Sequence, residues 1–166
     1  MTLEKFNTMH LSGAKDLLMT CCTAKNWVIQ TCSHRPFASE NDLFKKACNI
    51  WSKMLEDDFL EAFEGHPKIG DINSLAKKYR ITASMAEHEQ KTVTEASEHT
   101  LSCLAELNDQ YQKKFDFIFI VFASGKSASD MLSLLKSRLG NDRRKELMIA
   151  ASEQRKILQL RLRNLF

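Results

Sequence analysis

A bend-forming stretch near the middle of the chain carries the histidine best suited to acid–base chemistry. It runs Gly65-His66-Pro67-Lys68-Ile69-Gly70-Asp71. Pro67 fixes its own φ and restricts His66 to extended backbone, and the two glycines permit turns that other residues resist. Such a stiff loop can hold the His66 imidazole at a defined angle as a general acid or base near neutral pH. The alternative is a structural turn with a partly exposed histidine.

A second polar group is Glu87-His88-Glu89-Gln90, in a stretch with helical character. Adjacent residues on a helix point about 100° apart, so only part of this group can face one pocket. The sequence has neither a His-x-x-x-His pattern nor a His/Cys cluster, and it therefore predicts no metal site. The alternative interpretation of these four residues is a solvated polar face.

The third candidate is an arginine near the end of the chain. Arg161 lies four residues after Ile157 and three after Leu158, which places it near the apolar face of a helix. An arginine on such a face needs an anionic partner, because a buried unpaired charge is costly. A substrate carboxylate could be that partner. A structural salt bridge or a snorkelling side chain is the alternative.

Helices are predicted to position all three groups. The dominant residue types are Ala, Leu, Lys, Glu, Gln, Arg and Met, which favour helices. Residues 7–24 are expected to form one N-terminal helix, with apolar side chains at the i, i+3, i+4, i+7 spacing of a single face. Further helices are expected around Trp27, ending at Arg35-Pro36-Phe37, and over 57–64, 83–113 and 141–163.

Two more helices are predicted from their capping residues. Ser39 is typical of an N-cap with Asp42 as its capping-box partner. Ser127 with Asp130 opens another helix, which Gly140 is expected to end as a C′ glycine.

Residues 115–122 are rich in Phe, Ile and Val. We expect a buried extended segment there, because one isolated strand would have no partner for its backbone groups. With only 5 Gly and 2 Pro in 166 residues, a turn-rich β fold is disfavoured. The predicted architecture is all-α: a compact single-domain, multi-helix bundle over residues 1–166.

Charge and cysteine usage exclude several classes of protein. A net charge of +3 is too small to indicate nucleic-acid binding. No apolar run reaches the roughly 18 residues that a membrane span needs, and the first residues lack the apolar stretch of a signal peptide. The five cysteines are odd in number and form no C-x-x-C pair, which favours free thiols, mostly buried, in a reducing cytoplasm.

Taken together, these blocks resemble the 2-oxo-4-hydroxy-4-carboxy-5-ureidoimidazoline (OHCU) decarboxylase family over nearly the whole chain. The His66 loop is the most specific part of the resemblance. The other parts, in chain order, are the stretch 22–27 with Arg35-Pro36-Phe37, Glu89-Gln90, 115–121 with Gly125-Lys126-Ser127-Ala128, and Ile157-x-x-x-Arg161-Leu162.

The resemblance implies an all-α homodimer that converts its small-molecule substrate to (S)-allantoin in urate breakdown, with no metal or organic cofactor. It implies His66 and Glu89 as catalytic residues. It implies that the substrate-binding residues are Pro67, Gln90, Arg161, Ile118 and Ile120, the two isoleucines acting through the backbone of their segment.

The position of the carboxylate has two possible registers. Family members commonly have Ser three residues before the Glu of Glu-Gln, and here that position is Ala86. If Ser84 held that place, Glu87 and His88 would become the pair. We favour Glu89-Gln90, because both residue types are then kept.

Other functions remain to be weighed against decarboxylation. A non-catalytic helical interaction or regulatory module fits the helix content, but it has no need for the His66 loop with its distant partners. A nucleic-acid binder could use the basic C-terminal helix, but Glu146 and Glu153 interrupt it. A hydrolase of the preceding 5-hydroxyisourate is usually β-rich and would not be helical.

Overall fold

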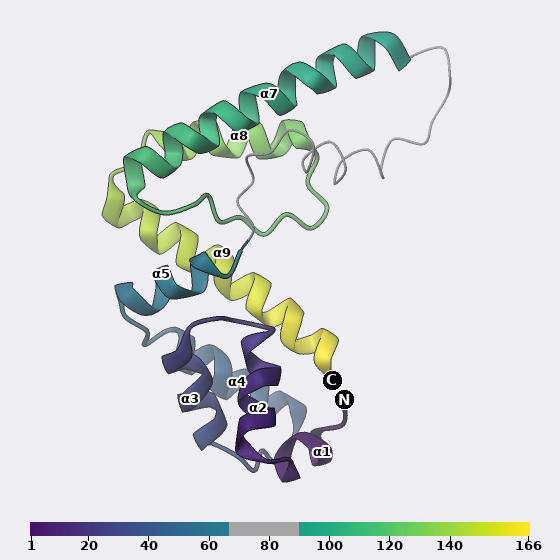
Figure 1. Ribbon diagram of the computed structural model, residues 1–166, viewed down its shortest axis with the longest axis vertical. Coiled ribbons are helices and arrows are strands. Elements are labelled where there is room, and N and C mark those ends of the chain that lie inside the picture. Colours follow the sequence, from purple (N-terminus) through teal and green to yellow (C-terminus); the bar gives the residue numbers. More distant parts are fainter. Residues whose placement is uncertain (67–89) are drawn as a thin grey trace. The chain divides into compact units, whose positions relative to one another are not determined.

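The computed structural model describes residues 1–66 and 90–166, without the side chains of residues 90–97. Every regular element in these residues is an α-helix (Figure 1), which confirms the all-α fold class. The helices are α1 (Leu3–Thr8), α2 (Leu11–Met19), α3 (Lys25–Ser33), α4 (Glu40–Trp51), α5 (Glu56–Glu64), α7 (Gln90–Phe115), α8 (Ala128–Leu139) and α9 (Arg143–Leu165). Within the described residues, no helix has an apolar stretch sufficient to cross a bilayer.

The chain divides into two compact units. Unit 1 comprises Met1–His66 and Ile149–Phe166, and unit 2 comprises Pro67–Met148. One boundary therefore follows His66 directly, and the other falls inside α9. A single domain over residues 1–166 stays a prediction.

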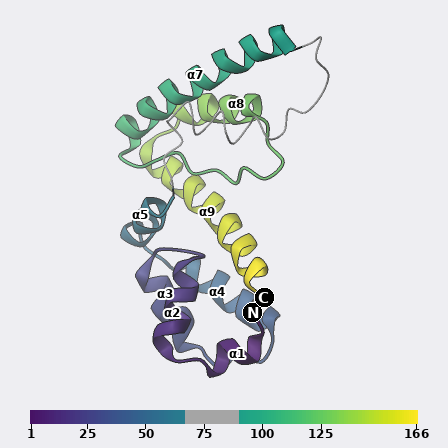
Figure 2. The same ribbon diagram turned by 45° about the vertical axis from the view of Figure 1, so that its right-hand side comes forward.

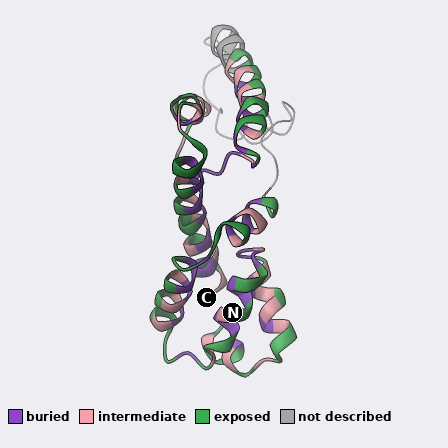
Figure 3. Cartoon of the chain, turned by 90° about the vertical axis from the view of Figure 1, so that its left-hand side faces the viewer, coloured by how far each residue is buried: buried purple, intermediate pink, exposed green. Residues whose placement is uncertain are grey.

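Unit 1 is built around α3, which packs against α2, α4 and α5. Its centre is Trp27, a fully buried side chain whose indole Nε1 donates to the Ala47 carbonyl at 3.0 Å. Trp51 in the same way donates to the carbonyl of Ala151 on α9 at 3.0 Å. Figure 3 shows that the helices have buried residues on one face and exposed residues on the opposite face. Because both indoles are satisfied, these large side chains can fill the core without an orphaned donor.

The predicted N-terminal helix over 7–24 is wrong, since the structure has two helices with a break at Met9 and His10. His10 caps α2, its Nδ1 accepting from the Ser12 amide at 3.3 Å. From α3's end, the Arg35 guanidinium donates to the carbonyls of Asn7 (2.9 Å) and Met9. These carbonyls at the end of α1 are therefore satisfied by a distant side chain instead of by a further helical turn.

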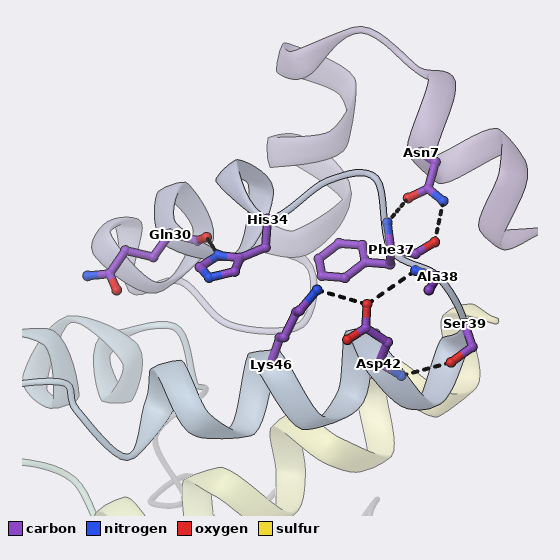
Figure 4. Close-up of polar contacts among 8 residues, drawn as sticks. All are labelled: Asn7, Gln30, His34, Phe37, Ala38, Ser39, Asp42 and Lys46. Atoms are coloured by element: carbon purple, nitrogen blue, oxygen red, sulfur yellow. Dashed lines mark hydrogen bonds and ion pairs between the residues drawn. The ribbon is translucent and has the colours of Figure 1, made fainter.

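Ser39 caps α4 as predicted, its hydroxyl accepting from the Asp42 amide at 3.1 Å (Figure 4). The expected capping box is not formed, because Asp42 Oδ2 accepts from the amide of Ala38, at 3.2 Å, instead of from that of Ser39. The same oxygen receives the Lys46 ammonium at 2.9 Å. Asp42 thus closes the turn one residue further out than the motif predicts.

In unit 2, α8 runs along α7 (Figures 1 and 2). After α7 the chain turns at Asp116, whose φ of 64° is left-handed, and residues 118–123 belong to neither a helix nor a strand. Phe117, Phe119 and Ile120 are almost completely buried there, and the Tyr111 ring of α7 lies 5.2 Å from that of Phe119, edge to face. The prediction of a buried segment that is not a strand is confirmed, except that Phe115 belongs to α7.

Helix α8 begins as predicted and ends differently. The Ser127 hydroxyl accepts from the Asp130 amide at 3.1 Å, and Asp130 accepts from the Ser127 amide at 2.9 Å, which completes a capping box. Gly140 is the C-cap, but with φ of −75° it is right-handed and not the left-handed C′ glycine expected.

Candidate active site

His66 is held by the way that α5 ends against Thr23. The Thr23 hydroxyl donates to the carbonyls of Glu61 (2.9 Å) and Ala62 (3.3 Å) in the last turns of α5. A Cβ on Gly65 would lie 2.2 Å from that hydroxyl oxygen. Gly65 has an ordinary φ of −72°, so glycine is required here for space and not, as expected, for an unusual turn. The His66 amide then donates to the Phe63 carbonyl at 3.0 Å, which fixes the start of the bend.

The His66 imidazole contacts a residue that the sequence analysis missed. Its Nε2 lies 2.6 Å from Oε1 of Gln154, a completely buried side chain on α9. Gln154 lies four residues before Leu158 and seven before Arg161, on the face of α9 that carries buried apolar side chains. Its position four residues after Ala150 and four before Leu158, two completely buried apolar residues, was the signal that could have identified it.

Burial and a neighbouring cation keep the His66 imidazole neutral. Desolvation lowers the pKa of His66 most, and the Arg161 guanidinium lowers it further, while the hydrogen bond to Gln154 acts in the opposite direction. Both larger effects disfavour the charged imidazolium. At neutral pH the site therefore presents an uncharged imidazole beside a fixed positive charge.

Arg161 is anchored by a backbone carbonyl. Its Nη1 donates to the Cys21 carbonyl at 3.1 Å, and the side chain is half-buried. Among the residues that the structure describes, no carboxylate forms a salt bridge with Arg161. A guanidinium has five N–H donors, and the described residues use only part of this donor capacity.

Two adjacent thiols lie close to these groups. Burial raises the pKa of both Cys21 and Cys22 to about 11, so they stay protonated and are poor nucleophiles. All five cysteines are free, as expected, although Cys48 and Cys103 are only partly buried. In the described parts of the chain no group of three or more His, Cys, Asp or Glu side chains could hold a metal ion.

Comparison with known proteins identifies the family. The sequence profile of OHCU decarboxylase matches residues 7–163. The chain belongs to the OHCU decarboxylase family. A crystal structure described as OHCU decarboxylase in the presence of (S)-allantoin is 35% identical, with a TM-score of 0.72 over 91% of this chain and 97% of that one.

Named relatives of this OHCU decarboxylase family member differ in length. The Uric acid degradation bifunctional protein TTL of Arabidopsis thaliana is 35% identical over 159 residues, which are 95% of this chain and 49% of that protein. The 2-oxo-4-hydroxy-4-carboxy-5-ureidoimidazoline decarboxylase of Amia calva is 30% identical over 134 residues, 80% of this chain and 75% of that protein. The chain thus spans about half of the Arabidopsis protein, and 32% of a bifunctional relative from Bacillus subtilis.

The structure brings together two of the seven site residues predicted from the family resemblance, His66 and Arg161. Pro67 and Glu89 lie outside the described residues, as do both registers of the carboxylate. Gln90 is the first residue of α7, and its side chain also lies outside the description. Ile118 and Ile120 belong to the extended segment of unit 2. The roles of these five residues stay predictions.

A buried ion pair holds the isoleucine segment in place within unit 2. Arg138 of α8 donates to the Ile120 carbonyl through Nη1 at 2.8 Å and to Glu146 Oε1 through Nε at 2.6 Å. The Tyr111 hydroxyl also donates to Glu146, and Asn141 donates to its other oxygen at 2.7 Å. Glu146 is completely buried, so these donors are what make its charge tolerable. Burial and the bond to Glu146 raise the pKa of Tyr111 well above its usual value.

Proposed function

We propose that this chain removes carbon dioxide from 2-oxo-4-hydroxy-4-carboxy-5-ureidoimidazoline and releases (S)-allantoin, a step of urate breakdown. The observation that carries the proposal is the pairing of a neutral, half-buried imidazole at His66 with an anion-accepting guanidinium at Arg161. It is supported by the family match over 7–163 and by relatives named for uric acid degradation. A substrate with a carboxylate to hold and a hydroxyl to deprotonate fits both groups.

The reaction breaks the bond between the ring carbon and its carboxylate. The electron pair of that bond moves into the adjacent C=N of the imidazoline ring, and the carboxylate leaves as CO2. The ring nitrogen that receives the C=N electrons takes up one proton. The hydroxyl on the first carbon then becomes a carbonyl as its proton is removed, and a proton is added to the neighbouring carbon, so that one proton is taken up overall. Because the substrate's own imine accepts the electrons, the protein's task is to position it and to move protons.

His66 and Arg161 divide this task. Arg161 binds an anionic or carbonyl oxygen and orients the ring, which a planar guanidinium does better than an ammonium. His66 accepts the hydroxyl proton or stabilises the developing oxyanion, a role that requires the neutral form favoured at this site. Both side chains come from unit 1, so α5 and α9 set their geometry.

The family resemblance supplies the remaining roles. We expect Glu89 to deliver the proton to one face of the new carbanion, which would give a single enantiomer. Pro67, Gln90 and the backbone at Ile118 and Ile120 are expected to line the substrate site. Replacing Glu89 and Glu87 separately distinguishes the two registers, since only the variant of the catalytic carboxylate should release racemic allantoin.

The test is a coupled assay in which urate oxidase and hydroxyisourate hydrolase generate the substrate in place. Optical rotation must be followed, because spontaneous decay gives racemic allantoin. His66→Asn should lower kcat about 10²- to 10⁴-fold with little change in KM, since it removes a proton-transfer group. His34→Asn is the matched control, because His34 is exposed and its Nδ1 contacts only nearby groups such as the Gln30 carbonyl (Figure 4).

A second pair of variants tests the binding role. Arg161→Ala should raise KM strongly, while Arg163→Ala removes an exposed arginine two residues further along α9 and should leave KM unchanged. Full activity in His66→Asn, or an unchanged KM in Arg161→Ala, would contradict the proposal. Circular dichroism of each variant separates lost chemistry from lost folding.

We further propose that the chain works without a cofactor, as a homodimer, in the cytoplasm. The five free thiols support a reducing compartment. Light scattering on the purified chain tests the dimer, and a fully active sample after dialysis against a strong chelator tests the absence of a metal requirement.

A further inference from the structure

We propose that Gln154 is a positioning residue that holds the proton of His66 on Nε2, and so makes Nδ1 the nitrogen that exchanges protons with the substrate. The inference rests on the proposed function for the identity of the proton donor. The assignment of the tautomer stands on geometry alone.

The tautomer follows from what an amide can do. Oε1 of Gln154 lies 2.6 Å from His66 Nε2, and an amide oxygen accepts hydrogen bonds but cannot donate them. The hydrogen between the two atoms must therefore belong to the imidazole. A neutral imidazole has one N–H, so its lone pair is on Nδ1. No described residue forms a hydrogen bond with Nδ1, which leaves that nitrogen available to a ligand.

The charge of the partner also matters. A carboxylate at position 154 would stabilise the imidazolium, whereas an amide gives an acceptor without a negative charge. The groups that face His66 from the described elements are the Arg161 guanidinium and the amide of Gln154, with the protonated Cys22 thiol beside that amide. None of these groups favours the charged imidazole strongly, so Gln154 can orient His66 while the imidazole stays neutral, with its lone pair on Nδ1.

A second observation separates this role from ordinary packing. Gln154 is completely buried, and its Nε2 has no hydrogen-bond partner of normal geometry among the described residues. It lies beside the weak acceptor sulfur of Cys22. A buried unpaired amide N–H destabilises a fold, so a leucine like the neighbouring Leu158 would suit the core better. The need for an acceptor at His66 explains why a glutamine occupies this position.

The experiment combines nuclear magnetic resonance with kinetics. In protein labelled with 15N-histidine, two-bond proton–nitrogen correlations report which ring nitrogen carries the hydrogen, and His66→Asn assigns the signals. Wild type should show Nε2–H with a bare Nδ1. Gln154→Leu should shift this population and lower kcat about 10- to 100-fold, with KM changed by less than about twofold.

Two further variants make the test specific. Gln154→Glu keeps an acceptor for Nε2–H, so it should keep the tautomer. The added carboxylate should raise the pKa of His66, which moves the acid limb of the kcat profile to higher pH. At a pH above that raised pKa the variant should regain activity. Gln159→Leu makes the same change on the same helix at a residue whose Nε2 donates to Cys48 Sγ at 3.1 Å, away from His66, and should change neither readout.

The outcomes distinguish this inference from the proposed function. A wild-type spectrum with the hydrogen on Nδ1, or a Gln154→Leu variant with unchanged spectrum and unchanged kcat, overturns the role of Gln154. A wild-type protein that shows the Nε2–H tautomer, loses it in Gln154→Leu and yet never decarboxylates the substrate supports the tautomer assignment while refuting the proposed function.

Discussion

Replacing Gly65 with alanine tests how the His66 bend is built. An added Cβ would lie 2.2, 2.5 and 2.9 Å from Oγ1, Cγ2 and Cβ of Thr23. All three separations are too short for real atoms, so either Thr23 must rotate or the end of α5 must move away. Rotation would break the hydroxyl's bonds to the Glu61 and Ala62 carbonyls. Movement would displace His66, the next residue.

The expected loss combines two effects. Overpacking in a close contact typically costs about 1–3 kcal/mol. Losing the Thr23 hydrogen bonds adds about 1 kcal/mol. Gly65→Ala should therefore lower the free energy of unfolding by about 2–4 kcal/mol, measured by urea denaturation followed by circular dichroism. The kcat should also fall, because the imidazole no longer meets Gln154 and the substrate at the original angle.

A double mutant identifies Thr23 as the cause. Thr23→Ala removes the two closest atoms, so it should restore part of the stability of Gly65→Ala, with a coupling energy of at least about 1 kcal/mol. Gly13→Ala is the control, because a Cβ there, inside α2, would meet nothing nearer than Met9 Sδ at 4.0 Å and should stabilise by up to about 1 kcal/mol. If Gly65→Ala matches wild type in stability, the close approach of α5 to Thr23 does not exist in solution.

Three further predictions follow from charges and caps. Glu146→Gln should lower the free energy of unfolding, measured by urea denaturation, by about 3 kcal/mol, because it leaves Arg138 buried beside a neutral amide. Glu153→Gln weakens the pair with the half-exposed Lys156 and should lower it by less than about 1 kcal/mol. Because the pKa of folded His66 is below its usual value, the unfolded chain binds a proton first as pH falls below about 6.5, so stability should decrease down to the folded pKa and then level off. His66→Gln should flatten that part of the curve, and an unchanged slope would contradict the assignment. Ser127→Ala should lower the free energy of unfolding by about 1 kcal/mol through loss of the α8 cap. Wild-type hydrogen-exchange protection of the α8 amides in this variant would count against the prediction.

Local signals predicted most of the helices, because the responsible contacts lie within a few residues. Ser39 and Ser127 cap their helices through bonds to amides three residues away. The break between α1 and α2 depends instead on Arg35, which reaches the carbonyls of Asn7 and Met9 from 28 and 26 residues away in the chain. The spacing of apolar residues within one segment cannot predict such a long-range contact.

The candidate site was predictable to the same degree. His66 and Arg161 stood out as a histidine in a stiff loop and a cation on an apolar face, and the structure places them close together. Gln154 did not, because a neutral amide on a helix carries no charge or motif, and its role depends on an imidazole 88 residues away. The steric reason for glycine at position 65 could not be predicted either, because it depends on Thr23, which lies in the connection between α2 and α3.

The uneven burial of the cysteines has a practical consequence for following motion in solution. Burial raises the pKa of Cys21, Cys22 and Cys32, so thiol-directed reagents, which attack thiolates, should spare them. The two partly exposed thiols fall one to each unit, Cys48 in the first and Cys103 in the second. Two spin labels attached there, without any engineered cysteine, would report the distance between the two units in solution with and without ligand.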